Sequence, residues 1–324
     1  MRPTFLARLV NGPLFDPVVF VHILNQRSDV LFDCGWFLDL SNRKLLSLDA
    51  VFISHPHMNH FMGLDHILRA ILHRTKPIHI YGPEGITDKV LSKLNSYTWN
   101  LTKDYLLEVI IHEVGEREIL TTSAPAREGF LPCGRESSER TGPTIARHQR
   151  YHVDAVILDH NIPCLGYVIR EPFHINIKGK TVMDLGYETG PWINRLKACI
   201  MADRMNEVIS VPTREGVKES GVRELMDELV ITSPGQKIAY LTDIRYSEDN
   251  IDRFKGIASH ADTLFIEAFY LSELEAQAHK RAHLTAKQAG MIGRMIQAKK
   301  VVPMHISPKY HGRVDDIMRE MENV

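Results

Sequence analysis

Short apolar runs separated by polar turns dominate the beginning of the chain. Residues 18–24, 30–33 and 51–54 are rich in Val, Phe, Ile and Leu, and polar or glycine-containing turns separate them. Such runs are typical of successive strands. Apolar side chains then recur at helical spacing over residues 64–72, and residues 78–81 return to a strand pattern. Strand and helix therefore alternate, which indicates an α/β fold.

The same alternation returns in the second half of the chain. Residues 151–158 and 165–170 predict two strands on either side of a polar corner that contains His160. The last third predicts a strand, a helix, a strand, a helix and a strand, over residues 238–242, 247–259, 263–266, 285–298 and 301–304.

Two polar stretches interrupt this pattern. Residues 121–150 are charged and contain several Pro and Gly residues, so we expect a loop or hairpin there rather than core. Residues 201–236 form a charged insertion whose apolar residues have the spacing of a short surface helix: Val222, Leu225, Met226 and Leu229. We expect a single domain over residues 1–324, with inserted or arm segments near 121–150 and 171–236.

The composition is that of an ordinary globular protein. Hydrophobic residues make up 44% and charged residues 24% of the chain, which argues against extensive disorder and against a membrane protein. Residues 4–24 are interrupted by Arg8, Gly12 and Asp16, so neither a signal peptide nor a membrane-spanning helix fits them. Four cysteines occur without a CxxC pair, which indicates neither a zinc knuckle nor a secreted disulfide framework. The cytoplasm is the simplest location.

The net charge of the chain is close to zero. Its formal value is -1 at pH 7, so no field over the whole protein attracts a phosphate polymer. A nucleic-acid substrate would therefore need a local basic patch.

Three histidines fall within six residues directly after a predicted strand. His55, His57 and His60 follow the apolar residues 51–53, so they lie on a loop at a strand end, where catalytic groups often occur. Imidazole suits zinc and similar metals, and His55 and His57, two apart on extended backbone, point to the same side and can share one ion. His60 is offset enough to address a second ion. A polar loop whose histidines only form hydrogen bonds is the alternative, but the density of histidine favours a metal centre.

Around these histidines the chain resembles a known family. Residues 52–65, with an HxHxNH core followed by Gly63 and Leu64, resemble the HxHxDH motif of the metallo-β-lactamase superfamily. Further segments are similar to its tRNA 3′-processing branch, ribonuclease Z, over residues 30–35, 80–86 and 158–167. The resemblance covers most of the chain and implies a four-layer αββα sandwich.

The resemblance also implies a full set of metal ligands. Residues 241–243 are similar to the bridging-aspartate motif of the branch, and residues 304–307 to the motif of its last histidine ligand. Two divalent ions, zinc or else manganese or iron, would then be held by two groups of residues: His55, His57 and His160 for one ion, His60 and His305 for the other, with Asp243 as the bridge. From the residues alone, Asp243 could instead cap the helix that follows it.

A glutamate and a histidine motif are specific to ribonuclease Z-like members. Residues 266–269 and 283–290 resemble the paired motifs that hold the proton donor for the leaving group, which implies this role for His283 with Glu267 as its partner. A carboxylate fixes the tautomer of a histidine and stabilises its protonated form, as a general acid requires. The alternative is that His283 belongs to the N-cap region of the next helix.

A glycine-proline turn lies in the middle of the chain. Gly190 and Pro191 resemble the turn near the RNA-gripping arm of the branch, which implies a substrate-binding role for them. An ordinary turn before a helix is the alternative.

One position departs from the family motif. Where the motif has an aspartate that binds the second ion and helps to orient or deprotonate the attacking water, this sequence has Asn59. An amide oxygen is a neutral and weaker ligand, and an amide accepts no proton as a base. One of the two ion sites can therefore be weak or empty. Asp65 does not obviously compensate, because an acid near a helix start has an ordinary electrostatic explanation.

Together these motifs predict a metal-dependent hydrolase that resembles ribonuclease Z in its phosphodiesterase chemistry. The resemblance implies precursor tRNA as the substrate and a homodimer as the assembly, while a smaller phosphodiester stays open and no membrane partner is expected. One alternative is a catalytically impaired homologue that binds RNA or another ligand, which Asn59 supports. Another is a hydrolase of a different ester or amide bond on the same scaffold, against which the His283 and Glu267 motifs argue.

Overall fold

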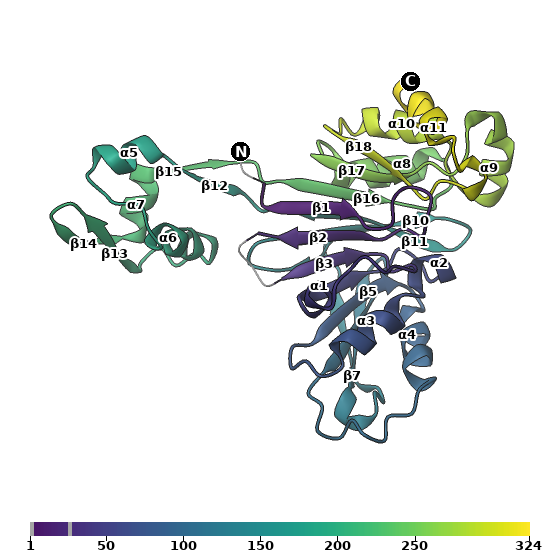
Figure 1. The fold of residues 1–324 in the computed structure, drawn as a ribbon, viewed down its shortest axis with the longest axis horizontal. Coiled ribbons are helices and arrows are strands. Elements are labelled where there is room, and N and C mark those ends of the chain that lie inside the picture. The colour runs from purple at the N-terminus through teal and green to yellow at the C-terminus, as the bar shows by residue number, and fades with distance from the viewer. Residues whose placement is uncertain (1–2, 25–27) are drawn as a thin grey trace. The chain divides into compact units, whose positions relative to one another are not determined.

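Two β-sheets form the centre of the larger part of the chain (Figure 1) in the computed structural model, which describes residues 3–24 and 28–324. Within these residues the first sheet has eight strands in sequence order: β1 (Phe5–Leu9), β2 (Val19–Ile23), β3 (Asp29–Phe32), β4 (Leu48–Phe52), β5 (Ile78–Pro83), β6 (Glu108–Val114), β7 (Glu118–Pro125) and β8 (Cys133–Glu139). The second sheet has six strands in the order β18 (Val301–Met304), β17 (Thr263–Glu267), β16 (Lys237–Leu241), β11 (Pro163–Arg170), β10 (His152–Asp159) and β9 (Thr144–Arg147).

Parallel pairing occupies the middle of the first sheet and one side of the second. β3, β4, β5 and β6 pair in parallel, as do β16, β17 and β18. Parallel strands are usually covered on both faces and therefore need nearly continuous apolar sequence. β3 and β16 fit this rule, because all of β3 and four of the five residues of β16 are buried. The apolar runs at residues 30–33 and 238–242 therefore predicted strands correctly.

Helices cover the outer faces of the two sheets (Figure 1). The first sheet packs against α1 (Asn42–Leu46), α3 (Leu64–Ile71) and α4 (Ile86–Asn95), and the second against α8 (Glu248–Ala258), α10 (Ala286–Met295) and α11 (Val314–Glu322). Shorter elements complete this part: α2 (Met58–Phe61), η1 (Ala126–Glu128), η2 (Ser272–Leu274), α9 (Glu275–Arg281) and η3 (Pro308–Tyr310). Among the described residues, no helix has both the length and the apolar sequence needed to cross a membrane.

Aromatic rings fill the space between the two sheets. Phe32 of β3 stacks on Phe52 of β4 and on Tyr240 of β16, with ring centroids 5.3 and 5.6 Å apart. The ring of Tyr167 in β11 lies 5.7 Å from that of Phe32, and its hydroxyl donates to the Ile53 carbonyl at 2.7 Å. These rings are buried, so each sheet has one face against its helices and one against the other sheet. This order of helix, sheet, sheet and helix is the four-layer arrangement that the resemblance implied.

Residues 146–152 and 170–236 form a second compact unit, and the rest of the chain forms the first. The second unit contains β12 (His174–Ile177), α5 (Gly179–Asp184), α6 (Trp192–Met201), β13 (Val208–Thr213), β14 (Gly216–Gly221), α7 (Val222–Leu229) and β15 (Val230–Ser233). Leu196, Ile209 and Leu225 lie in its own core. The N–H of Glu171 donates to the carbonyl of Gln236 at 2.8 Å, so the two ends of segment 170–236 lie side by side. α7 coincides with the predicted surface helix, whereas a single domain over the whole chain stays a prediction.

The structure corrects part of the expectation for residues 121–150. β7 and β8 pair antiparallel as a hairpin, but β7 also pairs with β6 and is not a loop. Ala124, Ala126 and Phe130 are fully buried in the core of the first sheet. The polar composition comes largely from β8, in which every residue is exposed. The exposed residues of edge strand β8 therefore gave the whole stretch 121–150 a polar composition, although the end of β7 is buried.

A close backbone contact places the histidine-bearing helix α2 beside the end of β3. The N–H of Gly63, between α2 and α3, donates to the Cys34 carbonyl at 2.7 Å, and the N–H of Cys34 donates to the His60 carbonyl at 2.9 Å. A Cβ added to Gly63 would lie 2.3 Å from the Gly35 carbonyl oxygen and 2.9 Å from that of Cys34. Glycine is therefore required at position 63 by space, because no side-chain carbon fits between these two turns.

We expect Gly63→Ala to lower the free energy of unfolding by about 1–3 kcal/mol, because the added Cβ forces packed backbone apart. Urea denaturation followed by circular dichroism measures the change. Gly256→Ala is the matched control, since Gly256 is an exposed residue of α8 where a Cβ meets nothing within 4 Å. That variant should gain about 0.5–1 kcal/mol from the higher helix propensity of alanine. A Gly63→Ala chain as stable as the wild type would disprove the tight contact.

Candidate metal centre

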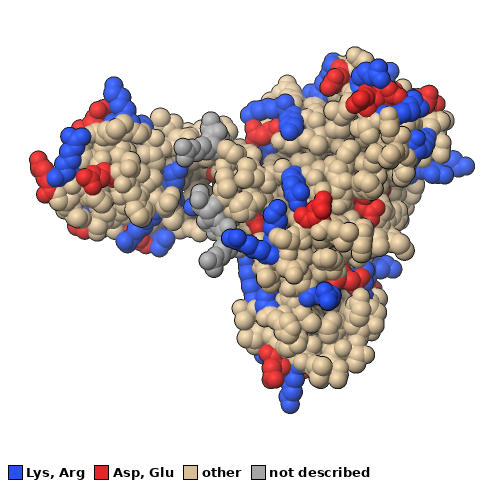
Figure 2. All heavy atoms as spheres, in the orientation of Figure 1, with Lys and Arg blue, Asp and Glu red and all other residues tan. Residues whose placement is uncertain are grey.

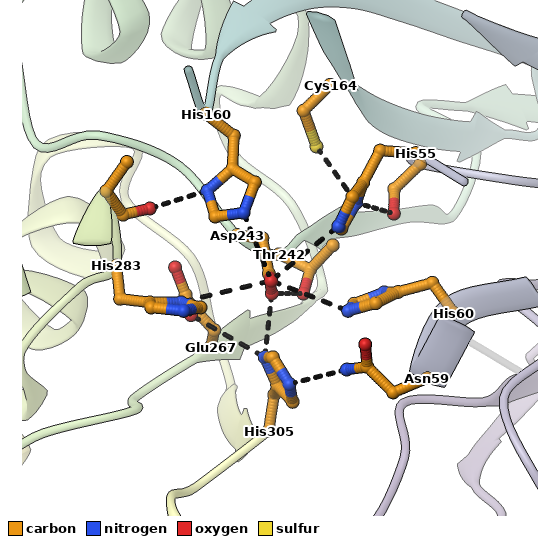
Figure 3. Close-up of polar contacts among 12 residues, drawn as sticks. His55, Asn59, His60, His160, Cys164, Thr242, Asp243, Glu267, His283 and His305 are labelled. Atoms are coloured by element: carbon orange, nitrogen blue, oxygen red, sulfur yellow. Dashed lines mark hydrogen bonds and ion pairs between the residues drawn. The ribbon is translucent and has the colours of Figure 1, made fainter. Parts of the chain in front are cut away.

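Loops that follow separate strands bring the predicted site residues together. His55 follows β4, Asp243 follows β16 and His305 follows β18, while His160 lies in the turn between β10 and β11. Because β16, β17 and β18 are parallel, their carboxyl ends lie at the same edge of the sheet. Figure 3 shows these side chains and that of His60 pointing toward a common centre, where the Asp243 carboxylate lies.

The buried Asp243 carboxylate is surrounded by imidazole nitrogens. Its Oδ2 lies 3.8 Å from His55 Nε2, 3.5 Å from His60 Nε2 and 3.6 Å from His160 Nε2. Its Oδ1 lies 2.7 Å from His305 Nδ1. In a first group, formed by His55, His57, His160 and Asp243, the possible ligand atoms all lie within 4.8 Å of one another. This spacing lets all four side chains contact one ion.

The histidine nitrogens that face this centre lack hydrogen-bond partners. His55 Nε2 and His60 Nε2 are both buried without a partner, although an unpaired buried polar atom costs about 1–3 kcal/mol. The opposite nitrogen of each ring is occupied: His55 Nδ1 lies 3.0 Å from Ser54 Oγ, and His60 Nδ1 lies 2.7 Å from Asp33 Oδ2. His160 follows the same pattern, since its Nδ1 donates to the Ala282 carbonyl at 2.7 Å. The nitrogens that face the centre thus lack protein partners, and the donor set fits a divalent ion that favours imidazole.

Asp33 is a further residue of the candidate site, which the sequence pattern did not single out. This fully buried carboxylate accepts hydrogen bonds from the Ser54 backbone N–H at 2.6 Å, the Ser54 hydroxyl at 2.7 Å and the Tyr240 hydroxyl at 2.6 Å. It also holds His60 Nδ1 as described above. A carboxylate behind a ligating histidine fixes the tautomer and orientation of the ring. Asp33 ends the predicted strand 30–33, and this position at a strand end is the signal that could have found it.

Backbone strain marks three of these loops. Asp33, Asp243 and His305 adopt positive φ angles of 52°, 25° and 53°, in a region that non-glycine residues rarely occupy. Such conformations persist where surrounding contacts enforce them, and they concentrate at functional sites.

The charges of the cluster keep several protons in place when no ion is bound. Burial raises the pKa of the Asp243 carboxyl, but the charges of His305 and His60 outweigh it and hold that pKa well below its usual range. Burial likewise opposes protonation of His60, whereas the Asp243 and Asp33 carboxylates raise the His60 pKa to about 9. Burial lowers the pKa of His55, and the neighbouring His60 lowers it further, so His55 is neutral. An ion that binds His60 must therefore displace its proton.

Partly buried His283 and fully buried Glu267 form a pair beside the cluster. His283 Nδ1 lies 2.9 Å from Glu267 Oε2, and Glu267 Oε1 accepts hydrogen bonds from the backbone N–H groups of Ile244 and Leu284, both at 3.1 Å. Phe269 stacks on the His283 ring at 4.2 Å. Burial opposes protonation of His283, but the Glu267 charge outweighs it and raises the His283 pKa above its usual value. This arrangement suits a proton donor.

The N-cap alternative for His283 is not what the structure contains. Thr285 caps α10 instead, because its side chain accepts from the Gln288 N–H and the Gln288 side chain accepts from the Thr285 N–H. Ser247 likewise caps α8, the helix that Asp243 could have capped. Neither His283 nor Asp243 therefore caps a helix, and both side chains belong to the cluster.

Asn59 lies in α2 and contacts the cluster through His305. Its Nδ2 lies 3.0 Å from His305 Nε2. Asp65, the nearby acid, forms an ion pair with Lys93 at 2.6 Å instead of facing the cluster. Asp65 therefore does not replace the missing aspartate at position 59.

Gly190 and Pro191 lie in the second unit, whereas all residues of the cluster belong to the first. Pro191 immediately precedes α6, and the Trp192 Nε1–H donates to the Glu188 carbonyl at 2.7 Å. The local geometry is that of a turn before a helix, and a substrate-binding role for Gly190 and Pro191 stays a prediction.

Comparisons with known proteins agree with this geometry. A family model described as a beta-lactamase superfamily domain matches residues 205–306, which include Asp243, Glu267, His283 and His305. Ribonuclease Z of Deinococcus radiodurans is 32% identical over 290 residues, which cover 87% of this chain and 83% of that protein. Ribonuclease Z of Bacillus cereus is 29% identical over 308 residues, covering 91% of this chain and 83% of the relative.

Solved structures share the fold at lower sequence identity. The short form of human tRNase Z has a TM-score of 0.53 at 18% identity, with 94% of this chain and 93% of that chain covered. A long-form RNase Z from yeast has a TM-score of 0.54 at 15% identity, covering 93% of this chain and 37% of the yeast chain. These likenesses confirm the predicted metallo-β-lactamase sandwich. Given 32% identity to a relative over most of both chains, the protein belongs to the ribonuclease Z family of metal-dependent hydrolases.

Proposed function

We propose that this protein is a metal-dependent endoribonuclease that cleaves precursor tRNA at its 3′ end. The observation that carries the proposal is the His283–Glu267 pair, with His283 Nδ1 2.9 Å from Glu267 and 3.9 Å from the Asp243 carboxylate. A proton donor next to a set of metal ligands matches the needs of phosphodiester cleavage, because the leaving oxygen must acquire a proton. Similarity to ribonuclease Z proteins over most of the chain supports tRNA as the substrate.

Two divalent ions are proposed for the site. His55, His57 and His160 hold one ion with Asp243, and His60 and His305 hold the other with the same carboxylate. Zinc is the first candidate because histidine-rich sites suit it, and manganese or iron is the alternative. When bound, such ions lower the pKa of water to about 7 and polarise a phosphoryl oxygen.

The protein side chains supply orientation and the proton. Asp33 holds His60, and through Ser54 it also fixes the ring of His55. Glu267 keeps His283 protonated and oriented, so His283 donates its proton to the leaving oxygen. Asn59 stands where the family motif has an acid, and it provides no base.

The RNA is proposed to bind through local contacts, because the net charge of the chain is -1. On the face drawn in Figure 2, Lys and Arg side chains are interspersed with Asp and Glu. Gly190 and Pro191 are proposed as part of the substrate-binding arm. A homodimer and a cytoplasmic location complete the proposal, both taken from the resemblance and the cysteine pattern.

We expect the zinc-loaded protein to cut a precursor tRNA that carries a 3′ trailer at one position near the end of the acceptor stem. Removal of metal by EDTA should abolish cleavage, and so should His57→Ala, which removes one proposed ligand of the first ion. Gel electrophoresis of end-labelled RNA measures the cut. His73→Ala, which removes an exposed imidazole at the end of α3, should cleave like the wild type.

The same assay separates the alternative functions. Turnover of a small aryl phosphodiester without any cut in the precursor tRNA would make the RNA assignment wrong. Tight binding of the tRNA without turnover of either substrate, at saturating zinc or manganese, would instead favour a homologue that only binds RNA.

We expect His283→Ala to lower kcat for tRNA cleavage about 10²- to 10⁴-fold, the usual contribution of a general acid, with the metal content unchanged. Glu267→Gln should shift the alkaline limb of the kcat/KM profile to lower pH, because the neutral amide no longer stabilises the protonated imidazole. Stopped-time assays from pH 6 to 10 and metal analysis measure both effects. An unchanged rate in His283→Ala with intact metal would remove His283 from the mechanism.

A further inference from the structure

We propose that a groove beside β1, β2 and α1 binds the phosphate backbone of the substrate RNA through Arg8, Arg43 and Lys44, away from the metal centre. This proposal rests on the proposed function and extends it by naming residues that hold the RNA. A chain with a net charge of -1 needs a local group of cations to bind a phosphate polymer. The groove supplies such a group.

The groove has a volume of about 860 Å³ and lies along elements of the first unit. β1 contributes Arg8, β2 contributes Phe20, and α1 contributes Arg43 and Lys44. Leu45 of α1 is fully buried in the core of the first sheet, whereas Arg43 and Lys44 are exposed. The short helix is therefore anchored by its apolar side, and cations from a strand and from a helix line one space.

The three cations keep their charge available to a ligand. Arg8 Nη2 donates to the backbone carbonyl of Asp39 at 2.9 Å, a contact that orients the guanidinium without neutralising it. Lys44 Nζ lies 5.4 Å from the centroid of the Phe20 ring. Within residues 3–24 and 28–324, none of Arg8, Arg43 and Lys44 forms an ion pair with a carboxylate. A bound phosphate would therefore meet charges that no acid of the described chain already satisfies.

Asp29 is the one acid among the described residues that line the groove, and its carboxylate is already engaged. Its Oδ1 lies 2.7 Å from His22 Nδ1, and the Ser47 hydroxyl donates to its Oδ2. Lys76 also lines the groove, but it forms an ion pair with Asp49. The buried acid and the paired lysine thus leave the surplus of positive charge with the three exposed cations.

The groove suits phosphates rather than bases. Phe20 is only 3% exposed and Lys44 lies over its ring, so the ring offers little surface on which a base could stack. Stacking on exposed aromatic rings is the usual source of affinity for unpaired bases. Contacts from Arg and Lys to phosphates position a nucleic acid without reading its sequence. We therefore expect binding that is independent of RNA sequence at this groove and strongly dependent on salt.

Strand β3 connects the groove with the metal centre. Asp29, its first residue, lines the groove, and Asp33, directly after its last residue, holds His60. A strand rises about 3.3 Å per residue, so the two places are about 13 Å apart along β3. An RNA with its scissile bond at the metal centre covers this distance within a few nucleotides. A contact at the groove therefore adds affinity without touching the reacting phosphate.

The test is the affinity for a fluorescently labelled precursor tRNA, measured by anisotropy at several salt concentrations. Zinc-loaded chains carry His283→Ala to slow cleavage, and gel electrophoresis verifies that the RNA stays intact. In this background, Arg43→Gln with Lys44→Gln should raise Kd about tenfold or more at about 100 mM salt. The slope of log Kd against log salt should fall by about 1–2, because each lost phosphate contact removes about 0.7–0.9.

Further variants separate the charge of the groove from other effects. Lys255→Gln with Lys300→Gln removes the same total charge from exposed positions outside the groove and should leave Kd within twofold. Arg43→Lys with Lys44→Arg keeps the charges of α1 and should bind like the parent chain. Arg8→Gln lies on β1 and should shift Kd and the salt slope in the same direction as the α1 variant. It decides the question if the α1 variant fails to fold by circular dichroism.

Three results would overturn the proposal. The first is a Kd within threefold of the parent and an unchanged salt slope in the groove variants, and the second is an equal loss in the Lys255 and Lys300 control. The third is calorimetric binding of free AMP that the groove variants abolish while the affinity for RNA stays unchanged. The proposed function can fail separately. RNA held through the groove without any cut rejects only the function, and a correct cut with unchanged affinity in the groove variants rejects only the groove.

Discussion

The buried carboxylate of Asp33 is the constraint on which the metal centre depends. It lies at the end of β3 with no solvent exposure, where an ionised group is stable only if hydrogen bonds satisfy it. Its donors come from different parts of the fold: Ser54 after β4, His60 in α2 and Tyr240 in β16. The Asp33 carboxylate thus links residues of both sheets to the ring of His60, a candidate metal ligand.

Protons and metal compete for the same nitrogens in this centre. The Asp243 carboxylate attracts protons onto His60 and His305 when no ion is present, and the pKa of His305 rises to about 10 although burial opposes it. A divalent ion held by these histidines would take the place of those protons, because a ligating imidazole nitrogen must be deprotonated.

The strands and the first three histidines could be predicted because they depend on local pattern, and the resemblance implied the rest of the cluster. Apolar runs followed by a polar residue predicted the strand ends where Asp243 and His305 lie. The contact between Asn59 and His305 could not be predicted, since the two residues are 246 positions apart and no pattern near either one refers to the other. Asp33 was not singled out because its one signal, an acid at the end of an apolar run, also occurs at many strand ends without a function. The prediction that residues 121–150 lie outside the core was wrong for a different reason. The exposed residues of β8 made the stretch polar on average, so the buried residues that follow the start of β7 were not recognised.

The long segment of the second unit, residues 170–236, is joined at its two ends to strands that are neighbours in the second sheet. Its segment 170–236 lies between β11 and β16, which are adjacent in the second sheet, and the Glu171–Gln236 hydrogen bond joins its two ends. A Cβ on Gly235 would lie 2.1 Å from the Glu171 carbonyl oxygen, so the ends are as close as two backbones can be. An insertion closed at its base in this way can lengthen, shorten or be exchanged without moving the strands that carry the metal ligands. Variation in this segment is therefore modular, and its length and sequence can change while the strands that carry the metal-ligand candidates keep their places.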